Sequence, residues 1–174
     1  MITQQHDVVL AFGSNLGDRA ATIRAAQQIL QRSDGIEAFR ASSLRETIAL
    51  TDHGLDVDAP RYLNGVVILR TSLDPLALLE LVRGIENTFG RERHEHWGDR
   101  TLDIDIITYG GKVVHEPDLT VPHKHAHERD FVLAPWLELD PDAVLIGHGR
   151  VAALLDALGD STTAYTESAE GVVR

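Results

Sequence analysis

The segment from Leu102 to Ile106 alternates strictly between apolar and acidic residues, in the order Leu-Asp-Ile-Asp-Ile. A period of two is typical of a β-strand with one buried face, because side chains two apart on a strand point to the same side. We therefore expect Leu102, Ile104 and Ile106 to lie in a hydrophobic core. Asp103 and Asp105 then share the opposite face, roughly 7 Å apart at a rise of ~3.3 Å per residue.

Two interpretations of this acidic pair are open. Asp is depleted in strands, and for an isolated Asp-x-Asp a solvated outer face is the more frequent reason. The alternative is a site for Mg²⁺, which typically binds one or two carboxylates together with substrate phosphates. Three nearby upstream arginines favour the second interpretation, because guanidinium groups neutralise phosphate charge from the other side. These are Arg91, Arg93 and Arg100.

Length and charge restrict the remaining classes of function. A chain of 174 residues predicts one domain over 1–174, with 159–174 as a small, polar tail that frays. The 16 Lys and Arg against 27 Asp and Glu give a net charge of −11, which disfavours nucleic acid or an anionic membrane as partner. With no cysteine, no visible signal peptide and no long apolar run, we expect a cytoplasmic protein. We also expect a monomer.

Hydrophobic periodicity predicts an alternation of strands and helices. Strands are expected at 7–12, 36–47 and 62–69, helices at 20–32, 76–89 and 151–158, a short edge strand at 112–115, and a helix over 128–137 that breaks at Pro135. The acidic stretch 48–61 is expected to be a flexible loop. With the strand at 102–106, the order β-α-β-β-α-β predicts an α+β, ferredoxin-like sandwich. Its mainly antiparallel sheet would carry helices on one face and leave the other free for a site, with extra C-terminal helices.

A cluster of histidines offers a rival metal site. His123, His125 and His127 alternate beside Glu128, and three imidazoles are able to ligate zinc. Lys124 lies among them, and its positive charge repels a metal ion. The zinc interpretation is therefore the weaker one, and we expect His123 to act as a hydrogen-bond donor to phosphate.

Four motifs together resemble a known family. They are WGDRTLDIDIITYG at 97–110, FGSNLGDR at 12–19, LTVPH at 119–123 and ERDFVL at 128–133. From about Val8 to about Leu158 the chain resembles the 6-hydroxymethyl-7,8-dihydropterin pyrophosphokinases, which are enzymes of folate synthesis. The resemblance implies a ferredoxin-like fold, ATP as co-substrate, and transfer of pyrophosphate from ATP to the hydroxymethyl group of the pterin with release of AMP.

The same resemblance implies roles for individual residues. Two Mg²⁺ ions would be held by Asp103 and Asp105, which are catalytic together with Arg91, Arg93 and Arg100. The implied ATP contacts are Glu86, Arg91, Arg93, Arg100, Ile106, His123 and Arg129. The flat pterin would stack between Trp97 and Phe131, with further contacts at Gly13, Thr47, Leu50, Tyr62 and Asn64.

Two positions depart from the family pattern, and two other classes of function stay open. Ile48 and Asp99 each replace a residue that is commonly proline in the family. We expect the acidic 48–61 loop and the basic 91–97 loop to close over the substrates. A ferredoxin-like RNA-binding module is one rival, although the negative charge disfavours it. A nucleotidyltransferase or hydrolase that uses the same two aspartates is the other.

Overall fold

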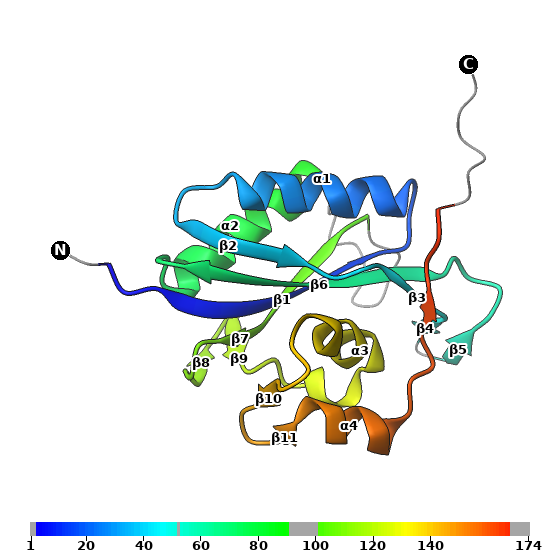
Figure 1. Ribbon diagram of the computed structural model, residues 1–174. Helices are drawn as coiled ribbons and strands as arrows, with labels where there is room; N and C mark the ends of the chain where they lie inside the picture. Colours follow the sequence, from blue (N-terminus) through cyan, green and yellow to red (C-terminus); the bar gives the residue numbers. More distant parts are fainter. Residues whose placement is uncertain (1–2, 52, 91–100, 168–174) are drawn as a thin grey trace.

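A six-stranded antiparallel sheet forms the middle layer of the protein (Figure 1). The computed structural model describes residues 3–51, 53–90 and 101–167. The strands follow the order β12-β3-β6-β1-β7, and β2 also pairs with β6. Their bounds are β1 His6–Ser14, β2 Ile36–Ala41, β3 Arg45–Thr47, β6 Tyr62–Thr71, β7 Asp103–Tyr109 and β12 Thr163–Ala164.

Helices cover both faces of this sheet. The helices α1 (Arg19–Gln31) and α2 (Pro75–Thr88) form the layer above it in Figure 1. The short 3-10 helix η1 (Ala126–Glu128), α3 (Asp130–Leu139) and α4 (Val151–Leu158) lie below. The described part of the chain also contains three small hairpins: β4 (Ala49–Thr51) with β5 (Gly54–Asp56), β8 (Val114–Glu116) with β9 (Leu119–Val121), and β10 (Val144–Leu145) with β11 (Gly149–Arg150).

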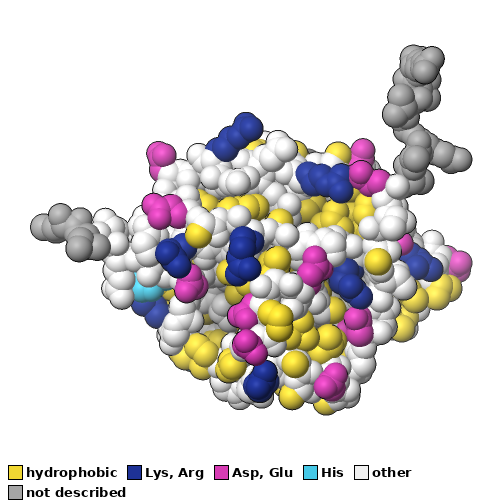
Figure 2. Space-filling model, in the orientation of Figure 1, with side chains coloured by type: hydrophobic (Ala, Val, Ile, Leu, Met, Phe, Trp, Pro, Cys, Tyr) yellow, Lys and Arg dark blue, Asp and Glu magenta, His cyan; other side chains and the backbone are white. Residues whose placement is uncertain are grey.

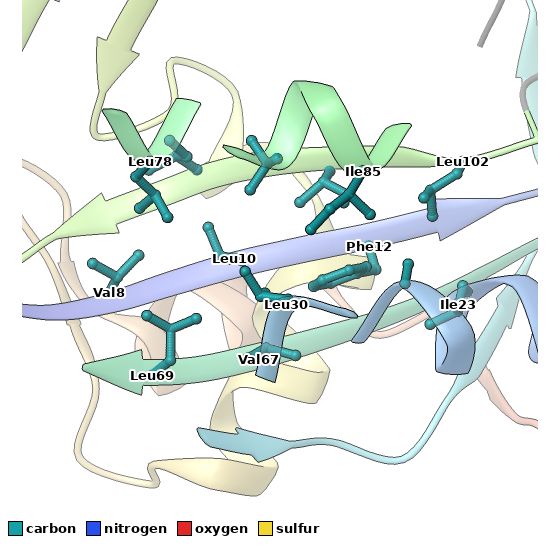
Figure 3. Close-up of a cluster of buried hydrophobic side chains, with 14 of the residues drawn as sticks. Val8, Leu10, Phe12, Ile23, Leu30, Val67, Leu69, Leu78, Ile85 and Leu102 are labelled. Atoms are coloured by element: carbon teal, nitrogen blue, oxygen red, sulfur yellow. The ribbon is translucent and has the colours of Figure 1, made fainter. Parts of the chain in front are cut away.

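Strand β1 supplies side chains to two separate cores. Val8, Leu10 and Phe12 point towards α1 and α2, where they meet Ile23 and Leu78 (Figure 3). Val9, on the other side of the strand, belongs to the cluster formed by α3 and α4. Because both faces of β1 are covered, its sequence is continuously apolar rather than alternating.

Side-chain caps fix where the first two helices begin. Asp18 Oδ1 accepts a hydrogen bond from the Ala21 N–H at 3.1 Å, which caps α1. Asp74 Oδ1 accepts from the Ala77 N–H at 2.8 Å, and Pro75 follows at the first position of α2. Each cap satisfies an N–H that has no partner inside its helix.

The prediction for β7 is confirmed. Leu102, Ile104 and Ile106 are at most 4% exposed and lie in the core under α1 and α2. The alternation ends at a bulge, because Val9 pairs with Thr108 whereas Leu10 pairs with Ile106. Ile107 is therefore an extra residue, and beyond it Tyr109 turns back to the α2 side, where its hydroxyl donates to the Leu73 carbonyl.

The second face of the sheet is not free, which corrects one expectation. α3 and α4 pack on it through Val132, Leu133, Trp136 and Val151. These helices cover the apolar part of the face and leave open the end that carries Asp103 and Asp105. The predicted break at Pro135 is also wrong, since α3 continues to Leu139. Pro135 is the sixth of the ten residues of α3, where it removes a single intrahelical hydrogen bond while its neighbours stay packed in the core.

Other segments differ in detail from the expected ones. The strand expected over 36–47 is divided into β2 and β3, and the 48–61 loop contains the hairpin β4–β5. The short edge strand falls at Val114–Glu116 and pairs with β9 instead of the main sheet. Thr163 and Ala164, inside the stretch expected to fray, pair with β3. The last helix, Val151–Leu158, has the expected bounds.

Charges on the visible surface are mixed. Figure 2 shows Lys and Arg side chains interspersed with Asp and Glu on this face.

Among the helices in the described part of the chain, none combines the length and the apolar character that crossing a bilayer requires.

Two isoleucines of α1 test this packing. Ile23 is fully buried, whereas Ile29 is 41% exposed. We expect Ile23→Ala to lower the free energy of unfolding by about 2–5 kcal/mol, because it leaves a cavity between α1 and the sheet. The matched control Ile29→Ala should cost less than about 1 kcal/mol. Urea unfolding followed by circular dichroism measures both, and equal losses would contradict the placement of α1.

Candidate active site

A cavity of about 620 Å³ opens at the end of the sheet that α3 leaves uncovered. Its volume lies in the usual range for small-molecule sites. It is lined by Ala11, Phe12, Gly13, Thr47, Ile48, Tyr62, Asn64, Asp103, Asp105, His123, Lys124, His125, Glu128, Arg129, Phe131 and Val132. These residues come from β1, from β3 and the residue after it, from β6 and β7, and from 123–132, which leads into α3, so the tertiary fold is needed to assemble them.

Strand pairing forms the floor of the cavity. Gly13 lies opposite Asn64 on one side and opposite Asp103 on the other. A Cβ on Gly13 would lie 3.4 Å from Asn64 Oδ1, which is an ordinary van der Waals contact. Asn64 is 5% exposed, and its Nδ2 donates to Thr47 Oγ1 at 2.9 Å. The polar interruption of the apolar β6 sequence thus fixes the side chain of β3 beside it.

The two aspartates face the cavity from β7, opposite the buried isoleucines. Asp105 Oδ2 lies 3.5 Å from Arg129 Nη1 and 3.7 Å from His123 Nε2. The Arg129 guanidinium also lies 5.6 Å from the centre of the Phe131 ring, which is the arrangement of a cation–π contact. Arg129 therefore connects the acidic side of the cavity to its aromatic side.

His123 is electrically neutral at pH 7 in this environment. Burial lowers the pKa of His123 to about 4, and the positive charge of Arg129 acts in the same direction. A neutral imidazole donates from one nitrogen and accepts at the other. Glu128, unlike His123, is charged at neutral pH. The hydrogen bond with His125 lowers the pKa of the Glu128 carboxyl. Glu128 is therefore negatively charged at the rim of the cavity.

The structure brings together many of the residues predicted from the sequence. Gly13, Thr47, Tyr62, Asn64 and Phe131, all expected at the pterin, line the cavity with Asp103, Asp105, His123 and Arg129. The predicted contacts Arg91, Arg93, Trp97 and Arg100 lie outside the described residues, as does Asp99. Leu50 lies in β4, and its side chain is outside the description. The binding roles of all these residues stay predictions.

Two predicted ATP contacts lie elsewhere in the described structure. Glu86 is 2% exposed on α2, and its Oε2 accepts a hydrogen bond from the Ile104 N–H at 3.3 Å. Ile106 is 4% exposed and faces the same core. Within the described ranges neither side chain lines the cavity. Glu86 instead forms a hydrogen bond with the backbone of β7 at Ile104, between Asp103 and Asp105.

Three polar or charged residues of the cavity were not among the predicted site residues. Lys124, His125 and Glu128 line its rim, next to His123. The sequence places them in the same short segment as His123 and Arg129, which was the available signal. In residues 3–51, 53–90 and 101–167 no group of three or more His, Cys, Asp or Glu side chains is arranged to hold a metal ion.

Comparison with known proteins gives the same interpretation as the motifs. Residues 9–141 match the model of the 7,8-dihydro-6-hydroxymethylpterin-pyrophosphokinase (HPPK) family. A 2-amino-4-hydroxy-6-hydroxymethyldihydropteridine pyrophosphokinase from Synechocystis is 38% identical over 162 residues, which are 93% of this chain and 80% of that protein. The chain belongs to the HPPK family. A Haemophilus influenzae protein of the same name is 34% identical over 151 residues, 87% of this chain and 92% of that protein.

A solved structure shows the same fold. The Plasmodium falciparum HPPK-DHPS structure with pteroate superposes with a TM-score of 0.66 at 16% identity. The match covers 88% of this chain and 42% of that one, so the chain spans less than half of the two-part protein. The ferredoxin-like α+β architecture expected from the sequence is therefore confirmed.

Membership of the HPPK family decides between the classes of function left open by the sequence. HPPK enzymes are diphosphokinases that take ATP as co-substrate and act on hydroxymethyldihydropterin in folate synthesis. The RNA-binding and nucleotidyltransferase alternatives are thereby set aside. No partner nucleic acid or membrane is indicated by the family or by its members.

The state of His123 is open to direct measurement. In the metal-free protein, the NMR signal of the His123 imidazole should titrate with a pKa of about 4, compared with 6.5 for an unperturbed imidazole. The unfolded chain then binds a proton that the folded chain does not, so His123 lowers the stability of the fold as pH falls from 6.5 towards 4. A His123→Asn variant assigns the signal, and a midpoint at or above 6.5 would contradict the buried placement.

Proposed function

We propose that this cavity transfers pyrophosphate from ATP to the hydroxymethyl group of 6-hydroxymethyl-7,8-dihydropterin, and that the transfer depends on Mg²⁺ held at Asp103 and Asp105. One observation carries the assignment of the site. The acidic pair lines the same cavity as Asn64, Tyr62 and Phe131. Groups suited to bind metal-bound phosphate therefore lie next to groups suited to bind a flat polar ring.

The donor set of the acidic pair fits a hard divalent cation. Both groups are carboxylates on one strand face, directed into the cavity. Mg²⁺ prefers oxygen ligands and often takes only one or two carboxylates, with water and substrate phosphates completing its shell. When bound, the two expected ions supply neutralisation of phosphate charge and polarisation of phosphoryl oxygens. A zinc site of histidines lacks comparable support in the described residues.

The other lining residues divide between the two substrates. His123 and Arg129 each place a nitrogen within 3.7 Å of Asp105 Oδ2, and we assign them to the ATP phosphates, with Arg91, Arg93 and Arg100 as predicted. Neutral His123 donates a hydrogen bond to phosphate, and Arg129 supplies positive charge. Phe131 offers a ring face for stacking, while Asn64 and Thr47 offer polar atoms at the pterin edge. Trp97 is the predicted partner of Phe131 on the other side of the pterin.

The proposed reaction is a single displacement. The hydroxymethyl oxygen forms a bond to the β-phosphorus of ATP, and the bond from that phosphorus to the α–β bridging oxygen breaks. AMP leaves with the bridging oxygen, and the hydroxyl proton is released. In such transfers the protein acts mainly by positioning and by stabilising charge. Here the β1–β6–β7 register sets the distance between the pterin floor and the acidic pair.

Several expectations from the sequence belong to this proposal. Closure of the 48–61 and 91–97 loops, a single domain over 1–174, a monomeric state and a cytoplasmic location all stay predictions. The β4–β5 hairpin supports the first in one respect, because its neighbour Ile48 lines the cavity.

The products of the reaction test the proposed function. With Mg-ATP, the protein should form AMP only when 6-hydroxymethyl-7,8-dihydropterin is present, one AMP for each pterin consumed. Chelation of Mg²⁺ by EDTA should abolish turnover, and added Mg²⁺ should restore it. Release of ADP or phosphate without pterin would contradict the pyrophosphokinase assignment, and full turnover in EDTA would contradict the metal dependence.

Substitution of one aspartate tests the metal site. Asp105→Asn keeps the size of the side chain but removes its charge, so we expect turnover to fall by at least about a hundredfold, the scale seen when one charge-stabilising group is lost. Asp103→Ala should also abolish turnover. Asp156→Asn, on the exposed side of α4, is the matched control and should keep the wild-type rate. Circular dichroism verifies folding, and a near-wild-type rate in either active-site variant would overturn the assignment.

A further inference from the structure

The segment that follows α4, residues 160–165, is attached to the rest of the protein by a dense set of hydrogen bonds. From here on, the tail means residues 160–165 only, a part of the stretch 159–174 that was expected to fray. It lies beyond residues 9–141, the part of the chain that matches the family model. In Figure 1 the tail runs from the end of α4 past β3, at the side of the sheet near the β4–β5 hairpin.

The tail first completes the edge of the sheet at β3. Thr163 pairs with Glu46 and Ala164 with Arg45, and the Tyr165 N–H donates to the Leu44 carbonyl at 3.0 Å. The three-residue strand β3 thus has β6 on one side and β12 on the other. A short edge strand is held by few hydrogen bonds, so a second partner restricts its position.

A side-chain network strengthens this attachment. Arg45 Nη2 lies 3.1 Å from Asp160 Oδ2, and Arg45 Nε donates to Thr162 Oγ1. The Thr162 hydroxyl in turn donates to Asp160 Oδ1. Thr162 is 8% exposed, and loss of its hydroxyl would remove the acceptor of the Arg45 Nε hydrogen bond, while Asp160 Oδ1 would still accept from the Thr162 N–H at 2.9 Å. Arg45 is two residues from Thr47, which lines the cavity.

The tail is also bonded to the opposite wall of the cavity. Asp130 Oδ2 accepts hydrogen bonds from both the backbone N–H and the hydroxyl of Ser161, the first at 2.7 Å. Asp130 is the first residue of α3 and lies between Arg129 and Phe131, both of which line the cavity. The far end of α3 is held separately, because Glu138 accepts from the N–H and hydroxyl of Ser43.

We propose that the tail sets the separation of the two walls of the pterin pocket, with Ser161 and Thr162 as positioning residues. One wall is β3 with Thr47, and the other is the start of α3 with Phe131. The tail joins them through consecutive residues, so a change in either attachment alters the space between a polar edge contact and a stacking ring. This inference rests on the proposed function, since it assumes that the cavity binds the pterin.

A double variant of the full-length chain tests the proposal. Ser161→Ala with Thr162→Val removes both hydroxyls and preserves the backbone. We expect the Kd and KM for the pterin to rise about three- to tenfold, a factor that corresponds to part of the three side-chain hydrogen bonds that the variant removes. The KM for Mg-ATP should rise by a smaller factor, because the acidic pair lies on β7, at the other end of the strand order from β12. Calorimetric titration, with a non-hydrolysable ATP analogue present, measures the pterin Kd.

Two further variants separate positioning from general stability. Thr163→Val makes the same chemical change at an exposed neighbour and should leave the pterin Kd unchanged. Ser161→Thr with Thr162→Ser keeps both hydroxyls and should restore tight pterin binding. A double variant with a lower Tm but a wild-type pterin Kd would overturn the proposal, as would failure of the hydroxyl-retaining variant to restore binding. Failure of the wild-type chain to bind pterin would overturn the proposed function itself.

Discussion

The pairing of β1 with β6 on one side and β7 on the other is the interaction on which the rest of the structure depends. It pairs both edges of a continuously apolar strand, whose two faces are covered by helices, and it brings Gly13 between Asn64 and Asp103. The hydrophobic register and the site are thereby linked, because a shift of one residue would turn the buried isoleucines of β7 to the cavity and the aspartates into the core. The packing that stabilises the sheet therefore also determines which groups face the substrates.

The electrostatics of the cavity follow from its position on an acidic protein. A net charge of −11 repels phosphate at long range, so an anionic substrate needs local positive charge. Arg129 provides it beside Asp105, and the same side chain lies over Phe131. Neutral His123 adds a hydrogen-bonding group without adding charge. Metal ions at the acidic pair would add positive charge for the phosphates, and the predicted contacts Arg91, Arg93 and Arg100 would add more.

The second face of the sheet is divided between packing and chemistry. α3 and α4 cover its apolar part, and the start of α3 forms one wall of the open end. A pocket wall at a helix start requires anchors, because Arg129 provides no side-chain cap there. The hydrogen bonds of Asp130 with the tail supply one anchor, and the bonds of Glu138 with Ser43 hold the other end of the helix. The walls of the cavity are therefore joined by parts of the chain far from the acidic pair in sequence.

The sequence by itself determined the faces of β7, the main helices and the family, because side-chain period, caps and contiguous motifs are local properties. Through the resemblance it also grouped Gly13, Asn64, Asp103, Asp105 and Phe131 in one predicted site, and the structure places all five around one cavity. Only the tertiary structure decided that Glu86 supports the backbone of β7, that α3 continues past Pro135, and that Thr163 and Ala164 join the sheet. Each of these features depends on a partner distant in the chain. Burial and strand pairing are determined by long-range contacts, which a local sequence pattern does not specify.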